Sequence, residues 1–103
     1  MKIVEEIGVP ALFEQTAEEC IELAHVCMKL ARKLRQENPT PIDIPDIMSK
    51  LDEETADVML CIEILKDEGY LPNTEYTEKI MHRKELRWVE RLEDWKSGIN
   101  DKS

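Results

Sequence analysis

Apolar side chains recur along most of this chain every three or four residues, which is the period of an amphipathic helix. The pattern covers residues 11–35, 45–68 and 75–96, whereas residues 1–7 fit either a short helix or a mobile arm. Two closely spaced prolines forbid a helix in residues 37–43. The sequence therefore predicts an all-α chain with three principal helices.

Proline, glycine and capping residues mark the predicted helix ends. Pro45 suits the first turn of the second helix, where an N–H would have no helical partner. Gly69 suits the left-handed end of the same helix. Asn73 or Thr74 can cap the third helix, and Gly98 is expected to end it. These residues set the predicted limits of the second and third helices.

The apolar arc of the first long helix covers roughly half of its circumference. Its members are Leu12, Phe13, Ala17, Cys20, Ile21, Leu23, Ala24, Cys27, Met28, Ala31 and Leu34. The opposite arc carries Glu18, Glu19 and Glu22, and Val26 and Lys29 continue it. An arc this wide predicts contacts with more than one neighbour. We therefore expect the first two long helices to pair with those of a second subunit, as a four-helix bundle in a homodimer or a dimer of dimers.

The second long helix has a carboxylate within its apolar face. That face comprises Ile47, Leu51, Val58, Cys61, Ile62 and Leu65. Glu54 lies on the same face, and Asp57 lies at its edge. A carboxylate in such a position is costly unless it is hydrogen-bonded, paired or bound to a metal. Either Glu54 extends past the apolar face to a Lys or Arg, or it belongs to a functional site.

Length and charge limit the classes of function. A chain of 103 residues predicts a single domain over 1–103. Its net charge of -9 argues against a nucleic-acid partner, because no basic surplus is available to displace counterions from phosphates. No apolar run is long enough to span a bilayer, and three cysteines without a CxxC spacing indicate a reducing compartment. We therefore expect a cytoplasmic protein that binds neither nucleic acid nor membranes.

Two groups of acids carry the candidate chemistry. Glu18, Glu19 and Glu22 form one group, and Glu54 and Asp57 form the other. Spacings of three and four residues place the acids of each group on one helix face, and antiparallel packing of the two helices would let the groups face each other. Carboxylates gathered in this way repel one another unless a cation lies among them. Because oxygen ligands favour Mg²⁺ or Mn²⁺ over zinc, the acids predict a magnesium site that acts on a phosphate substrate.

The two groups together resemble the signature of a known family. EExxE at 18–22, followed by ExxD at 54–57, is similar to the paired motifs of the MazG-like all-α nucleoside triphosphate pyrophosphohydrolases. Residues 79–83 are similar to the family's downstream Lys/Arg segment, and the resemblance extends over residues 11–92. The gap between the motifs is longer than in many members and includes the proline-rich loop, which leaves substrate choice open.

The resemblance implies Mg²⁺-dependent hydrolysis of a nucleoside or deoxynucleoside triphosphate to the monophosphate and pyrophosphate, for house-cleaning or control of nucleotide pools. The positions that match the family's metal ligands are Glu19, Glu22, Glu54 and Asp57. Glu18 matches the first acid of the motif and joins these ligands in the implied catalytic set. Lys79 and Arg83 match the phosphate-contacting positions.

Two other classes of function are compatible with the sequence. Glu22 and His25 form the Glu-x-x-His motif of di-iron carboxylate bundles, and a homodimer supplies that motif and Glu54 twice. This alternative leaves Glu19, Asp57 and the basic row of the third helix without a role. The other alternative is a non-catalytic acidic helical adaptor, in which the charged rows are solvated faces.

Overall fold

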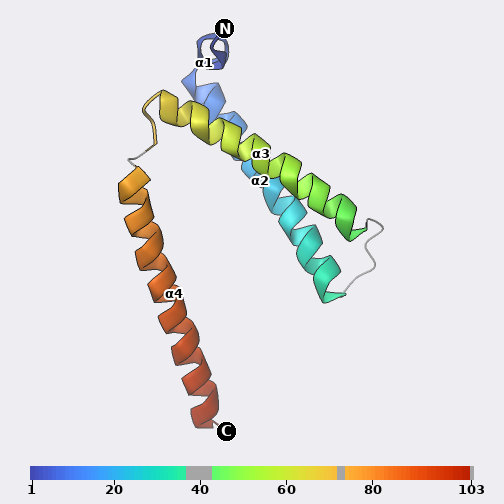
Figure 1. Ribbon diagram of the computed structural model, residues 1–103, viewed down its shortest axis with the longest axis vertical. Helices are drawn as coiled ribbons and strands as arrows, with labels where there is room; N and C mark the ends of the chain where they lie inside the picture. The colour runs from blue at the N-terminus through green and yellow to red at the C-terminus, as the bar shows by residue number, and fades with distance from the viewer. Residues whose placement is uncertain (37–42, 72–73, 103) are drawn as a thin grey trace. The chain divides into compact units, whose positions relative to one another are not determined.

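The computed structural model describes the backbone of residues 1–36, 43–71 and 74–102, and the side chains as far as Gly98. Within these residues it contains no strand, and its helices are α1 (Ile3–Ile7), α2 (Val9–Arg35), α3 (Ile44–Asp67) and α4 (Thr74–Lys102) (Figure 1). The prediction of an all-α chain with three long helices is therefore confirmed. The chain divides into two compact units, Met1–Leu71 and Pro72–Ser103. The single-domain prediction stays a prediction.

The limits of α2 and α3 lie close to the predicted ones. α2 begins at Val9 with a proline in its first turn and ends at Arg35, and the next residue, Gln36, is left-handed with φ 57°. α3 begins at Ile44, and Pro45 lies in its first turn. The predicted loop over 37–42 and the predicted cap Asn73 lie outside the described residues.

Gly69 ends α3 as predicted. Its φ is 80°, a left-handed conformation in which glycine has no Cβ to clash. The N–H of Gly69 donates to the carbonyl oxygen of Lys66 at 2.9 Å, and the N–H of Tyr70 donates to that of Leu65 at 3.0 Å. These two bonds form a Schellman motif, which satisfies carbonyl groups that the helix leaves open. The Tyr70 ring then packs edge-on against Phe13 of α2, with ring centroids 5.6 Å apart.

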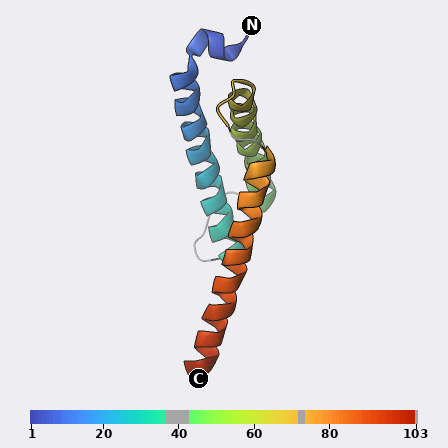
Figure 2. The same ribbon diagram turned by 90° about the vertical axis from the view of Figure 1, so that its left-hand side faces the viewer.

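α2 and α3 pack against each other and run antiparallel (Figures 1 and 2). The buried and half-buried residues that form this seam alternate at spacings of four and three, as in a helix pair. On α2 they are Leu12, Thr16, Glu19, Leu23, Val26 and Leu30, and on α3 they are Ile47, Leu51, Glu54, Val58, Cys61 and Leu65. Leu12, Ile47 and Leu65 are the most deeply buried, each 2% exposed. The seam is therefore the core of the first unit.

The face of α2 that packs in the seam differs from the predicted one. The pattern assigns Val26 and Glu19 to the solvated arc, but Val26 is buried and Glu19 is half-buried. Leu12 and Leu23 of the wide apolar arc lie in the seam, but four other bulky members are exposed: Phe13 by 42%, Ile21 by 55%, Met28 by 57% and Leu34 by 63%. These apolar residues are exposed because the arc of α2 is wide enough for two packing faces, and α3 packs along only one edge of it. The other face of the arc is largely exposed, and Phe13 at its N-terminal end contacts the Tyr70 ring.

α4 continues beyond its predicted end. Gly98 does not terminate the helix, which reaches Lys102. A glycine within a helix costs only about 1 kcal/mol relative to alanine, so it need not end one. Met81, Trp88, Leu92 and Trp95 recur along one side of α4, and all are exposed. None of the helices in the described residues is long and apolar enough to cross a bilayer.

Candidate metal centre

Glu19 and Glu54 occupy the middle of the two stripes that form the seam. Leu51 and Val58 flank Glu54 one turn away on either side, and Leu23 follows Glu19 by one turn. Both acids are half-buried. A helix pair held only by apolar packing would place leucine or valine at these positions, because a carboxylate there loses part of its hydration. The structure thus gives Glu19 the position within the packing face that the sequence indicated for Glu54 alone.

Three acids from the two helices converge at this point of the seam. One carboxylate oxygen of each of Glu19, Glu54 and Asp57 lies within 4.8 Å of the other two. α2 contributes Glu19, and α3 contributes Glu54 with Asp57, which is exposed at the edge of the seam. Antiparallel packing therefore brings together one acid of EExxE and both acids of ExxD. Three of the four predicted metal ligands form this acidic group.

Electrostatics at the centre act most strongly on Glu54. Partial burial and the neighbouring carboxylate of Asp57 raise the pKa of Glu54 above its ordinary value of 4.5, and Lys50 opposes the rise. Glu19 and Glu22 of α2 raise this pKa further. Glu54 therefore keeps its proton to a higher pH than an isolated glutamate does, because a proton relieves the repulsion among acids that a cation would also relieve.

Gln15 holds one member of the acidic group in position. Its side-chain Nε2 donates a hydrogen bond of 2.8 Å to Oε1 of Glu19, one turn further along α2. The remaining oxygen of Glu19 stays available for another partner. Sequence reasoning missed Gln15 because it considered only the acids, although the spacing of four residues was a signal.

A small cavity of about 160 Å³ adjoins the acidic group between α2 and α3. Its lining residues are Glu22, His25, Val26, Lys29, Ile47, Lys50 and Glu54. Lys29 and Lys50 place two cations beside the carboxylates, from opposite helices. Neither lysine was predicted to belong to the site. Lys50 could have been found from its position one turn before Glu54.

The other acids of the EExxE motif lie in different surroundings. Glu22 lines the cavity beside Glu54, but it lies outside the group of three converging acids. Glu18 is exposed, and it belongs neither to that group nor to the cavity lining. His25 lines the cavity with Glu22, but it too lies outside the converging group. Among the described side chains, three acids of the magnesium hypothesis form one group, and that group includes neither Glu22 nor His25 of the Glu-x-x-His motif.

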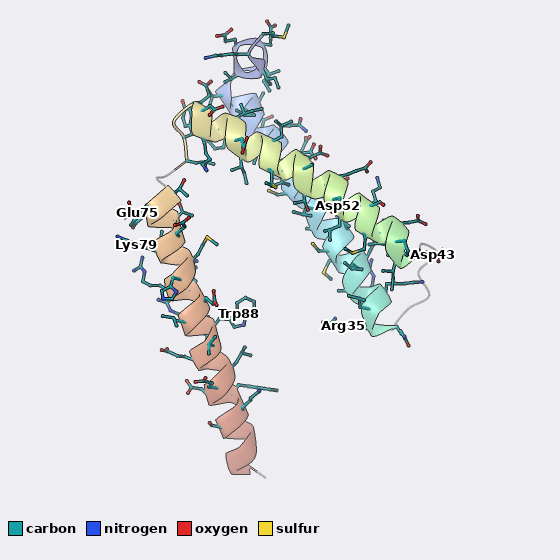
Figure 3. All side chains as sticks on the ribbon, in the orientation of Figure 1. Arg35, Asp43, Asp52, Glu75, Lys79 and Trp88 are labelled. Atoms are coloured by element: carbon teal, nitrogen blue, oxygen red, sulfur yellow. The ribbon has the colours of Figure 1, made fainter. Side chains whose placement is uncertain are left out.

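The predicted phosphate-binding residues lie on α4, in the second unit. Lys79 and Arg83 line a shallow hollow on this helix together with Glu75, Tyr76, Glu78 and His82. The Lys79 ammonium lies 4.0 Å from the Glu75 carboxylate in the preceding turn, and both side chains are more than two thirds exposed (Figure 3). An ion pair this exposed contributes little stability, so it leaves Lys79 able to bind an anion.

No protein-family model, curated protein or solved structure matches this chain. The resemblance to the MazG-like enzymes therefore rests on the sequence alone, on the residues of the two motifs and of segment 79–83.

Proposed function

We propose that this chain is a divalent-cation-dependent nucleoside triphosphate pyrophosphohydrolase of the MazG-like type. The observation that supports this most directly is the convergence of Glu19, Glu54 and Asp57 in the seam of an antiparallel helix pair. Acidic clusters are common on exposed helices. Two half-buried acids that face each other across a packing seam are different, because they destabilise the fold unless a cation binds between them. Their presence in the seam therefore favours a functional role.

The donor set fits Mg²⁺ or Mn²⁺. All the candidate ligands are carboxylate oxygens, which these hard cations prefer. The 4.8 Å within which the oxygens of Glu19, Glu54 and Asp57 lie is close to the roughly 4 Å between opposite oxygens around Mg²⁺. Glu22, beside Glu54 in the cavity, is the proposed fourth ligand. When bound, the ion supplies Lewis-acid polarisation of phosphate oxygens and lowers the pKa of a water molecule.

The remaining groups of the chain position the substrate and move the proton. Water attacks the α-phosphorus of the triphosphate, and either Glu18 or an acid of the converging group accepts its proton. Lys79 and Arg83 neutralise charge on the β- and γ-phosphates. Lys50 supplies a further cation from the cavity that contains Glu54. Pyrophosphate leaves, and the nucleoside monophosphate retains the oxygen that came from water.

The decisive experiment identifies the bond that is cut. The eight common ribo- and deoxyribonucleoside triphosphates are incubated with the protein and Mg²⁺ in water enriched in ¹⁸O, and the products are separated and weighed. We expect pyrophosphate and a monophosphate that carries the ¹⁸O label. Orthophosphate would show that a different bond is cut. Absence of any product with all eight nucleotides would favour the adaptor function.

A matched pair of variants ties the activity to the seam. Glu54→Gln keeps the shape of a proposed ligand and removes its charge, and turnover should fall by orders of magnitude. Glu53→Gln removes the same charge from the adjacent, exposed position. We expect Glu53→Gln to retain activity within a few-fold. Equal losses in both variants would indicate that net charge, and not the acidic group, supports turnover.

The same proposal includes a homodimer or a dimer of dimers, in which α2 and α3 pair with those of a second subunit as a four-helix bundle. It is supported by the exposed apolar residues of α2, among which Leu34 is 63% exposed. Exposed apolar residues gathered along one helix are typical of an interaction surface. Sedimentation that shows only monomer at micromolar concentration would contradict the assembly.

A further inference from the structure

The apolar face of α2 that α3 leaves uncovered has nearly the same pattern of residues in both directions. Its members are exposed except for half-buried Ala31, and Phe13 at one end contacts Tyr70. We call this face the outer stripe, and its members are Phe13, Ala17, Cys20, Ala24, Cys27, Ala31 and Leu34. Alternate spacings of four and three place these residues along one side of the helix. Bulky residues lie at the two ends, and alanine and cysteine alternate between them around Ala24. A two-fold axis requires such a self-complementary surface, because both copies present the same patch.

The residues beside the outer stripe distinguish between the two directions of pairing. Glu14, Ile21, Met28 and Arg35 follow one another at intervals of seven along its edge, and all are exposed. Figure 3 shows Arg35 at the C-terminal end of α2. Antiparallel pairing places Glu14 of each copy near Arg35 of the other and joins Ile21 to Met28. Parallel pairing would place like charges together at both ends, which is unfavourable.

We infer that the outer stripe binds a second copy of this chain, with the two α2 helices antiparallel and crossing at Ala24. Small side chains at the middle of the stripe allow the helix axes to approach closely, since the interaxial distance depends on the residues at the contact. Glu22 and Ala24 are about 200° apart around the helix, so the acids stay accessible on the other side. The inference requires neither a metal nor a nucleotide.

This register makes a specific prediction about two exposed thiols. Crossing at Ala24 sets Cys20 of one copy about 1.5 Å along the helix axis from Cys27 of the other, at a rise of 1.5 Å per residue. The like pairs are separated by about 12 Å for Cys20 and about 9 Å for Cys27, which is too far for a disulfide. Both thiols are free and exposed, whereas the remaining cysteine, Cys61, is buried in the seam.

Oxidation with diamide tests the register. Diamide accepts the two hydrogens of a pair of thiols as the sulfur–sulfur bond forms, and the covalent dimer is detected without reductant. We expect the wild-type protein to give this dimer, and Cys20→Ser and Cys27→Ser each to lose it. A mixture of the two variants should recover it after subunit exchange, and peptide mass spectrometry should assign the bond to Cys20 and Cys27.

Different outcomes would overturn the inference. A covalent dimer from either single variant would show a parallel pairing or another register. Absence of a dimer in the wild type, with both thiols still reactive to maleimide, would show that the outer stripe does not pair in this way. Charge reversal gives a second measurement: Arg35→Glu should lower the dimer fraction in sedimentation, and adding Glu14→Arg should restore it. No restoration would contradict the antiparallel charge pairing, whether or not the protein hydrolyses nucleotides.

Discussion

Replacement of Gly69 by alanine tests whether the turn after α3 has the conformation described above. The left-handed φ of 80° costs an L-residue about 1–2 kcal/mol. No heavy atom lies within 4 Å of the position that a Cβ would take, so no clash adds to this cost. The smaller backbone freedom of alanine in the unfolded chain offsets about 0.4–1 kcal/mol. We therefore expect Gly69→Ala to lower the free energy of unfolding by about 1 kcal/mol, the difference of these terms.

The assay is thermal unfolding followed by circular dichroism, at one protein concentration because of the proposed dimer. For a unit of this size, about 1 kcal/mol corresponds to a fall in Tm of about 4–8 °C. Gly69→Asn is the matched control, since asparagine tolerates the left-handed region and often ends helices there. Gly69→Asn should lower the Tm by less than Gly69→Ala does. A loss as large with asparagine as with alanine, or no loss with alanine, would refute the reasoning.

The remaining predictions concern the acids and the cations. The folded chain raises the pKa of Glu54 above 4.5, so protonation of Glu54 favours folding. The stability gained from this proton is fully present below pH 4.5 and is lost as the pH rises through the raised pKa. Without metal, the Tm of the wild type relative to Glu54→Gln should therefore rise as the pH falls from 7, and a flat difference would contradict the shift. His25→Ala should keep Mg²⁺-dependent turnover within a few-fold, and stoichiometric iron that is lost in this variant would instead support the di-iron alternative. Lys79→Ala and Arg83→Ala should each reduce kcat/KM for the triphosphate about tenfold or more, as expected for loss of one charge-stabilising group. The Tm should stay unchanged in both variants. Unchanged kinetics would show that Lys79 and Arg83 are solvated side chains that do not contact the phosphates.

The period of the apolar residues was sufficient to predict the three long helices, and proline and glycine residues predicted most of their ends. Gly69 was predictable because a glycine after the last apolar position has few other roles. Gly98 looked similar, but the helix continues because glycine is tolerated there at small cost. A glycine therefore shows where a helix can end. Whether the helix does end there depends on the helix propensity of the following residues and on their packing.

The acidic site was only partly predictable. Glu54 could be found because it interrupts an otherwise apolar face. The half-burial of Glu19 could not be found in this way, because the wide arc of α2 did not show which edge packs against α3. Val26 was misplaced for the same reason. Lys50 and Gln15 were missed because only the acids were considered, although each lies four residues from an acid of the site.

Binding of Mn²⁺, followed by electron paramagnetic resonance without any nucleotide, is the most direct test of the claim that the seam acids hold a divalent cation. The account predicts that the wild-type protein reduces the signal of free Mn²⁺ as a site fills, and that Mg²⁺ competes for that site. Glu54→Gln should weaken this binding at least tenfold, as expected for loss of a charged ligand, whereas Glu53→Gln should leave it almost unchanged. Equal binding by the wild type and Glu54→Gln, or no saturable site in the wild type, would contradict the account.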